Sequence, residues 1–148
     1  MAKGATGLSA TAQIALVGCG YWGKNLARNL DALNVLHLVC DPSEHGRNTA
    51  NEVAPNVETS SSFSDAIERA GIDAVVIATP AETHFDLAHR AMESGRDVFV
   101  EKPLALSAEE GEQLLKLAEQ HDRILMVGHL LEYHPAVLRL RELVDEGE

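Results

Sequence analysis

Three glycines near the start of the chain have the spacing of a loop that binds a dinucleotide. Gly18, Gly20 and Gly23 follow an apolar, strand-like run and precede residues with helical spacing. In this context the first glycine allows a tight turn, the second lets a pyrophosphate approach the backbone, and the third lets the helix pack closely on the strand. We predict that these glycines, with Tyr21 and Trp22 between them, bind a dinucleotide at a helix N-terminus. The alternative is a glycine-rich turn without a ligand.

A carboxylate follows the second apolar run. Asp41 lies after Gly23 near the spacing at which an acidic residue accepts hydrogen bonds from the adenosine ribose. Because a carboxylate repels a 2′-phosphate, Asp41 favours NAD over NADP as the cofactor. The nearest basic residue, Arg47, is expected to be solvated on the following helix. Asp41 could instead cap that helix, a role that Ser43 could also fill.

Two further polar stretches follow apolar runs, and they resemble a known family. One is Ala-Thr-Pro-Ala-Glu-Thr-His at residues 78–84, and the other is Glu101-Lys102-Pro103. Ligands bind at the carboxyl ends of strands in parallel sheets, so both stretches would share a site with the glycine loop. Together with that loop, they resemble the Gfo/Idh/MocA family of sugar and polyol oxidoreductases, from about residue 13 to the end of the chain.

The resemblance implies roles for individual residues. Lys102 would lie beside the nicotinamide and the sugar hydroxyl that is oxidised, while Glu101, Thr79, Pro80 and His84 would help to hold the cofactor. A lysine in that position can orient the hydroxyl and take part in proton transfer. The alternatives are a surface lysine and, for His84, a helix-start residue whose ring is satisfied within the protein.

The segment Gly-His-Leu-Leu-Glu-Tyr-His-Pro at residues 128–135 refines the resemblance. Tyr133 and Pro135 fit the family pattern, whereas Leu130 and Leu131 replace polar residues. This variant resembles the branch that oxidises UDP-N-acetylglucosaminuronic acid at its 3-position. The resemblance therefore implies a sugar or UDP-sugar substrate.

Composition excludes several other classes of protein. The formal net charge of -11 disfavours a nucleic-acid partner. The sequence has neither a bilayer-spanning apolar run nor a signal peptide, so we expect a cytoplasmic protein.

Cys19 and Cys40 lack a CxxC partner and are expected to be buried free thiols. His129, Glu132 and His134 have no recognised ligand spacing, so we expect no metal site.

The elements that must position these residues follow from the alternation of short β-branched runs with helical segments. The pattern predicts one α/β domain with a doubly wound parallel sheet of the Rossmann type, in strand order 3-2-1-4-5-6. The expected strands are 14–17, 35–40, 57–59, 74–78, 98–100 and 124–127, and the expected helices are 21–33, 43–53, 63–70, 84–94, 108–121 and 135–145. Ser107 with Glu110 predicts a capping box, and Pro135 suits a first helical turn.

The chain has 148 residues, a length that corresponds to one domain. We expect residues 1–12 to be disordered and residues 13–148 to form the dinucleotide-binding domain. Family members continue into a second domain that forms the substrate wall, so the resemblance implies that this chain keeps the cofactor site and has little catalysis by itself. The uncovered face would then permit weak self-association. The alternative is a stand-alone NAD-binding or sensor module.

Overall fold

The computed structural model describes residues 12–147 as an α/β domain. The strands are β1 (Ile14–Val17), β2 (Leu36–Cys40), β3 (Glu58–Ser60), β4 (Ala74–Ile77), β5 (Asp97–Val100) and β6 (Leu125–Val127). The helices are α1 (Gly23–Ala32), α2 (Glu44–Val53), α3 (Ser64–Glu68), α4 (His84–Glu93), α5 (Ala108–His121) and α6 (Pro135–Glu146), with short 3-10 turns η1 (Ala81–Thr83) and η2 (Leu130–Tyr133). The sequence predicts disorder for residues 1–12. Residues 1–11 lie outside the described residues, and Ala12 is buried.

All strands are parallel and lie in the order β3-β2-β1-β4-β5-β6, which confirms the predicted topology. The order reverses between β1 and β4, and ligands bind in such sheets at this reversal. The predicted elements are all present, with ends that differ by a few residues. The first helix begins at Gly23 and not at Tyr21, because the glycine loop occupies the residues between strand and helix.

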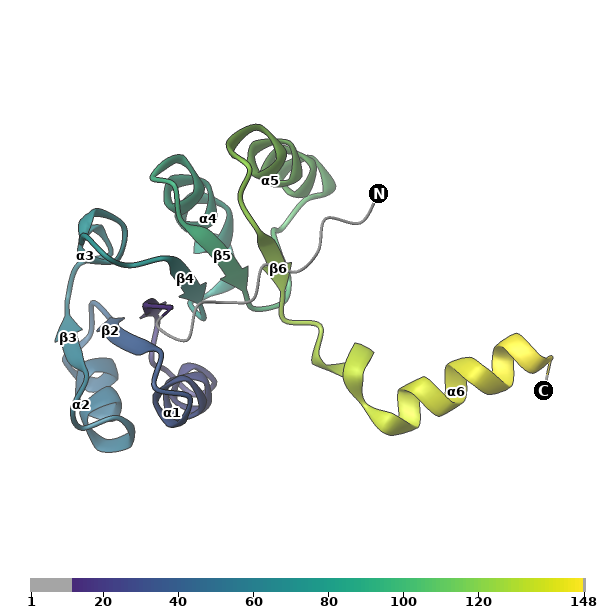
Figure 1. The fold of residues 1–148 in the computed structure, drawn as a ribbon, viewed down its shortest axis with the longest axis horizontal. Coiled ribbons are helices and arrows are strands. Elements are labelled where there is room, and N and C mark those ends of the chain that lie inside the picture. The colour runs from purple at the N-terminus through teal and green to yellow at the C-terminus, as the bar shows by residue number, and fades with distance from the viewer. Residues whose placement is uncertain (1–11, 148) are drawn as a thin grey trace.

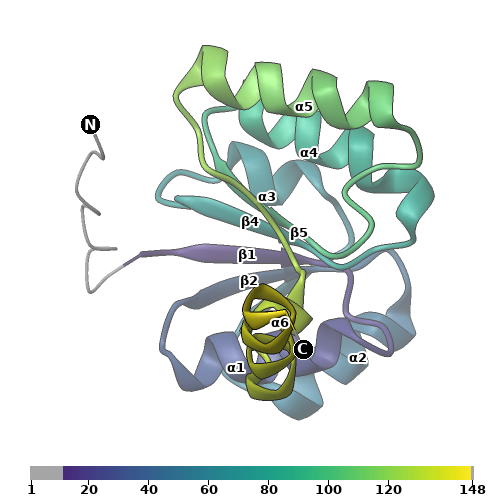
Figure 2. The same cartoon turned by 90° about the vertical axis from the view of Figure 1, so that its right-hand side faces the viewer.

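Helices cover both faces of the sheet. Figure 2 shows α1 and α2 on one face and α3, α4 and α5 on the other. Side chains alternate between the faces along each strand, so Leu16 and Val39 enter the core beneath α1 and α2, whereas Val17 and Ile77 enter the core beneath α3, α4 and α5. The sheet is therefore buried on both sides, as its continuous apolar strands predicted.

Local signals fix the ends of several helices. The Ser107 side chain accepts a hydrogen bond from the Glu110 N–H, and the Glu110 carboxylate accepts from the Ser107 N–H, which confirms the capping box. Ser43 caps α2 by accepting from the Gly46 N–H. Pro135 is the first residue of α6, as predicted. These caps satisfy N–H groups that the first helical turn leaves without a partner.

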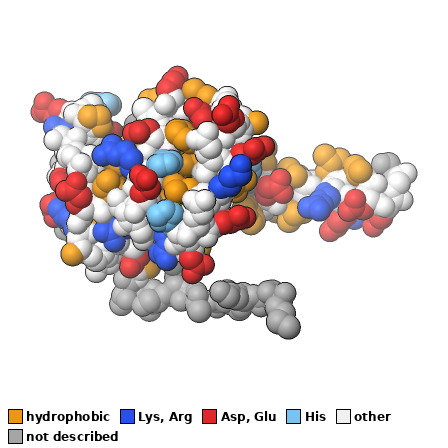
Figure 3. All heavy atoms as spheres, turned by 90° about the horizontal axis from the view of Figure 1, so that it is seen from above, with side chains coloured by type: hydrophobic (Ala, Val, Ile, Leu, Met, Phe, Trp, Pro, Cys, Tyr) orange, Lys and Arg blue, Asp and Glu red, His pale blue; other side chains and the backbone are white. Residues whose placement is uncertain are grey.

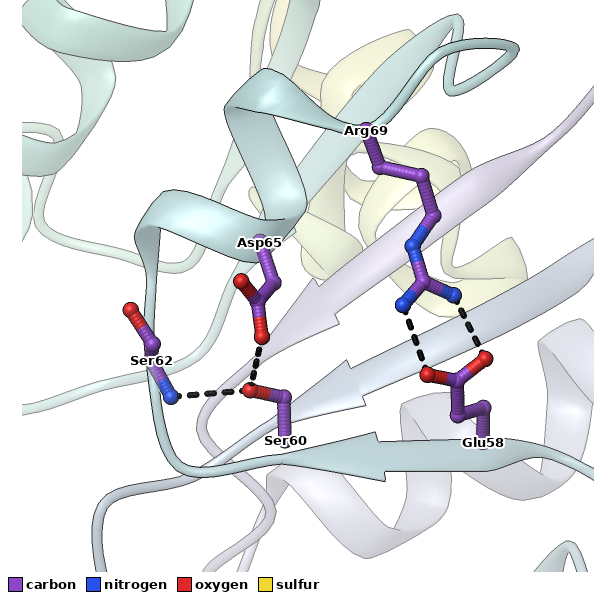
Figure 4. Close-up of polar contacts among 5 residues, drawn as sticks. All are labelled: Glu58, Ser60, Ser62, Asp65 and Arg69. Carbon is purple, nitrogen blue, oxygen red and sulfur yellow. Dashed lines mark hydrogen bonds and ion pairs between the residues drawn. The ribbon is translucent and has the colours of Figure 1, made fainter.

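Polar contacts order the loop after the edge strand β3 (Figure 4). Arg69 donates two hydrogen bonds to Glu58, at 2.7 and 2.6 Å, and these bonds lower the pKa of Glu58. Ser60 donates to Asp65 and accepts from the Ser62 N–H at 3.0 Å. These contacts link Asp65 of α3, and Arg69 just after α3, to residues of β3, so the loop between β3 and α3 has a defined course.

The last helix projects from the domain. In Figure 1, α6 extends away from the sheet, and its contacts are mainly with η2. Hydrophobic side chains lie along one side of the projection in Figure 3, and Val137, Leu140 and Val144 on this helix are exposed. Within residues 12–147, no helix has the length and apolar content needed to cross a membrane.

Candidate functional site

The glycine loop has the close packing that its spacing predicted. Gly18 has a φ of +89°, and a Cβ there would lie 2.7 Å from the carbonyl oxygen of Ala78. A Cβ on Gly23 would lie 2.1 Å from the carbonyl oxygen of Gly18, so α1 approaches the strand as only glycine allows. Around a Cβ built on Gly20, no atom of the described residues lies within 4 Å. The loop is therefore packed at its two ends and open in the middle.

Two cavities flank this loop at the carboxyl edge of the sheet. The first has a volume of about 780 Å³, and the second of about 840 Å³. Both fall within the usual size of small-molecule sites. Residues along the first include Trp22, Glu101, Lys102, Gly128, Leu130 and Leu131. Residues along the second include Gly18, Gly20, Asp41, Ser43, Ser61 and Pro80. Tyr21, Ala78 and Thr79 line both, so the cavities adjoin.

Asp41 faces the second cavity and is tied to the glycine loop. Its Oδ2 accepts a hydrogen bond from the Cys19 N–H at 2.8 Å, and its Oδ1 accepts from the N–H and the hydroxyl of Ser43 at 2.9 and 2.7 Å. Burial raises the pKa of Asp41, but the hydrogen bonds from Ser43 and Cys19 outweigh it, so the pKa is lowered. The residue is therefore an anionic acceptor at the end of β2, and Ser43 takes the capping role.

The prediction that Arg47 is solvated was wrong. Its side chain is half-buried, and Nη1 donates to the carbonyl oxygens of Asp41 and Pro42, at 2.8 and 3.0 Å. The turn into α2 brings these carbonyls within reach of a side chain one helical turn further on. A cation thus lies beside Asp41 and contributes to lowering its pKa.

Comparisons with known proteins agree with this geometry. The Gfo/Idh/MocA family model, described as an oxidoreductase family with an NAD-binding Rossmann fold, matches residues 12–129. The chain belongs to this family of oxidoreductases. The match includes the glycine loop, Asp41 and the Glu101-Lys102-Pro103 stretch, and it establishes NAD as the kind of cofactor that this fold binds.

Curated relatives and solved structures show what the chain is similar to. It is 32% identical to 2,7-anhydro-N-acetylneuraminate hydratase of Mediterraneibacter gnavus, over 93% of this chain and 36% of the relative. It is 34% identical to UDP-N-acetylglucosamine 3-dehydrogenase of Acidithiobacillus ferrooxidans, over 86% and 40%. Scyllo-inositol dehydrogenase of Lactobacillus casei, solved with NAD(H) and scyllo-inositol, gives a TM-score of 0.82 at 27% identity, over 93% and 42%. The chain thus spans about two fifths of these proteins.

Two residues of the Glu-Lys-Pro stretch, Glu101 and Lys102, line the first cavity. Glu101 is buried, with 8% of its surface exposed, and Oε1 accepts a hydrogen bond from the Trp22 indole N–H at 2.7 Å. This bond joins the end of β5 to the glycine loop. Lys102 is exposed and lines the same cavity. The structure therefore brings Trp22, Glu101 and Lys102 together along one cavity.

The Thr-Pro turn after β4 lies between the two cavities. Thr79 lines both cavities and Pro80 lines the second. The hydroxyls of Thr79 and Thr83 lie 2.7 Å apart, and the Thr83 hydroxyl donates to the Pro80 carbonyl at 2.8 Å. His84 is buried behind this turn and lines neither cavity. Its ring lies against backbone carbonyls, as in the alternative interpretation of this residue.

Two glycines that sequence reasoning did not assign support the carboxylates of the site. A Cβ on Gly46 would lie 2.2 to 2.5 Å from the carboxylate atoms of Asp41, and a Cβ on Gly128 would lie 3.1 Å from those of Glu101. Gly46 lies inside α2, where glycine costs about 1 kcal/mol relative to alanine. In the sequence, Gly46 could have been noticed because it lies inside the helix predicted to follow Asp41, where glycine is unfavourable.

The cysteines contribute packing to the site. Cys19 lies in the glycine loop, just beyond β1, and Cys40 is the last residue of β2; both are buried free thiols. Burial raises the pKa of Cys19 to about 11 and that of Cys40 to about 12. Within the described part of the chain, no cluster of three or more His, Cys, Asp or Glu residues is arranged to hold a metal ion.

Proposed function

We propose that this chain forms the cofactor-binding part of an NAD-dependent oxidoreductase that oxidises a secondary hydroxyl of a sugar or sugar nucleotide. The observation that carries the proposal is the pair of adjoining cavities at the strand-order reversal. Asp41 lines one cavity and Lys102 lines the other, and the glycine loop lies between them. This arrangement has a place for each half of a dinucleotide and for its pyrophosphate.

The residues of the second cavity fit the adenosine half of NAD. A carboxylate has about four acceptor positions, and Asp41 uses three of them for Cys19 and Ser43, which leaves one for a ribose hydroxyl. The open side of Gly20 leaves the backbone accessible to the pyrophosphate. The N-terminus of α1 supplies a favourable dipole for its charge.

Lys102 is the proposed catalytic residue in the first cavity. NAD, when bound, supplies the acceptor for the hydride that leaves the hydroxyl-bearing carbon. The Lys102 side chain, as a neutral amine, would accept a hydrogen bond from the substrate hydroxyl and take its proton as the carbonyl forms. Thr79, Pro80 and Glu101 would hold the cofactor, and the indole of Trp22 would close one wall.

The proposed substrate class is a UDP-sugar, and specifically UDP-N-acetylglucosaminuronic acid oxidised at its 3-position. The relative from A. ferrooxidans is named for 3-dehydrogenation of UDP-N-acetylglucosamine, and Leu130 and Leu131 line the first cavity of this chain. Since the chain aligns with only part of each relative, we propose that it binds cofactor and that turnover needs a further substrate wall. Free thiols and NAD-dependent chemistry suit a cytoplasmic protein.

Calorimetric titration with NAD, NADP and UDP-sugars tests the proposal. We expect NAD to bind, NADP to bind more weakly, and UDP-sugars to bind weakly to the isolated chain. A chain that binds none of the dinucleotides would contradict the cofactor assignment. Rapid sugar oxidation by the chain alone would contradict the need for a further wall.

A further inference from the structure

His84 joins the two loops on which the site depends. It is the first residue of α4 and has only 1% of its surface exposed. Nδ1 lies 2.6 Å from the carbonyl oxygen of Pro103, and Nε2 lies 2.9 Å from the carbonyl oxygen of Thr79. One carbonyl belongs to the loop after β5 and the other to the loop after β4. A single buried side chain therefore bridges both loops.

Lys102 lies between two anchored neighbours. On one side, the Glu101 carboxylate accepts a hydrogen bond from the Trp22 indole at 2.7 Å. On the other side, the Pro103 carbonyl lies against the His84 ring. The exposed Lys102 side chain extends from the backbone between these anchors and lines the first cavity. The contact with His84 therefore anchors the backbone on the C-terminal side of Lys102.

We propose that His84 is a positioning residue, which sets the course of Lys102 through the Pro103 carbonyl without touching cofactor or substrate. The inference rests on the proposed function, because it assigns Lys102 to the nicotinamide side of the site. Both acceptors are carbonyl oxygens, so each hydrogen bond needs an N–H of the ring. For the bond to Pro103, Nδ1 must carry a proton.

A chemical probe of Lys102 tests the inference on the chain as it is. An amine-acylating reagent is applied with and without saturating NADH, and modification is read by peptide mass spectrometry. Lys116, exposed on α5, is the internal reference. We expect NADH to protect Lys102 and not Lys116, whereas ADP-ribose, which lacks nicotinamide, protects neither.

Two variants separate the two nitrogen contacts of His84. The amide of His84→Asn lies near the Nδ1 position and keeps a donor for Pro103, whereas that of His84→Gln lies near Nε2 and keeps a donor for Thr79. We expect protection of Lys102 by NADH to persist in His84→Asn and to be lost in His84→Gln. NADH affinity should stay within about fivefold in both, the effect of one neutral hydrogen bond. His89→Asn, also on α4 but with 36% of its side chain exposed, is the matched control and should behave like the native chain.

Equal protection in His84→Asn and His84→Gln, whether kept or lost, would overturn the inference. If a variant fails to fold, the protonation of His84 in the native chain still tests the inference. Nitrogen-15 NMR should show a proton on Nδ1 of His84, and a bare Nδ1 would also overturn it. Failure of the native chain to bind NADH would contradict the proposed function. If the native chain binds NADH and NADH protects Lys102, but the two His84 variants do not differ in that protection, this inference alone would be contradicted.

Discussion

The carboxylate of Asp41 occupies the space that a Cβ on residue 46 would need. The nearest carboxylate atoms would lie 2.2, 2.3 and 2.5 Å from that Cβ, so Gly46 and the orientation of Asp41 are linked. The same carboxylate binds the N–H of Cys19. A change in α2 therefore reaches the glycine loop through Asp41.

Gly46→Ala should weaken NAD binding although alanine favours helices. The methyl group would displace Asp41 and disturb its bonds, and a hydrogen bond to a charged group is worth about 1.5 to 3 kcal/mol, so we expect an affinity loss of about tenfold or more. Gly111→Ala in α5 is the control, because the nearest atom to its Cβ lies 3.9 Å away. That variant should bind NAD normally and unfold at a higher temperature. Titration calorimetry and thermal melts distinguish the two.

Gly20→Val should abolish NAD binding and leave the fold intact. A Cβ on Gly20 meets no described atom within 4 Å, so the side chain enters the space proposed for the pyrophosphate. Gly23→Val should instead prevent folding, since its Cβ would overlap the Gly18 carbonyl. Circular dichroism and NAD titration report both effects. Undiminished NAD affinity in Gly20→Val would show that the pyrophosphate does not bind beside Gly20.

Asp41→Ser should reduce the preference for NAD over NADP by about tenfold, because it removes the charge that repels a 2′-phosphate. Arg47 would then be available beside that phosphate, since its guanidinium lies 2.8 Å from the Asp41 carbonyl. Adding Arg47→Leu should cancel the gain in NADP affinity. The prediction fails if the ratio of NAD affinity to NADP affinity is the same in Asp41→Ser as in the native chain.

The free energy of unfolding should fall at high pH. Burial raises the pKa of Cys19 to about 11 and that of Cys40 to about 12, from an ordinary value of 9.0. Such groups stabilise the folded state below pH 9, and this contribution is lost as the pH rises through the folded-state values. Urea unfolding at several pH values should show a shallower fall in Cys40→Ala than in the native chain. Identical slopes would argue against the raised pKa.

The exposed side of α6 should mediate weak self-association. Val137, Leu140 and Val144 lie on one side of the helix, with exposed fractions of 37%, 61% and 64%. Leu140→Glu should reduce the concentration-dependent mass seen in sedimentation equilibrium and leave NAD affinity unchanged. A native chain that stays monomeric at every concentration would refute the prediction.

The fold could be predicted because its signals are local. The alternation of β-branched runs with helical segments predicted the parallel sheet, right-handed crossovers predicted its strand order, and the spacing of Gly18, Gly20 and Gly23 located the loop. The direction of long side chains could not be predicted in this way. Arg47 turns back to the carbonyls of Asp41 and Pro42 because of the turn before α2, which the sequence pattern does not specify.

Contacts between loops that are distant in the sequence could not be predicted either. The partners of His84 are Thr79 and Pro103, and the second of these becomes a neighbour only because β4 and β5 pair in the sheet. Gly128 approaches Glu101 for a similar reason, because β6 lies beside β5. Such contacts require the assembled sheet, so a single sequence indicates the residue types and not the pairing.

The bond between Trp22 and Glu101 gives the protein an optical label of its own. Trp22 is the only tryptophan among the 148 residues, and its indole N–H lies 2.7 Å from a carboxylate oxygen at the rim of the first cavity. All tryptophan emission therefore originates at the proposed nicotinamide site. Quenching of that emission, or its transfer to a reduced nicotinamide, would report occupancy of this cavity without any added dye.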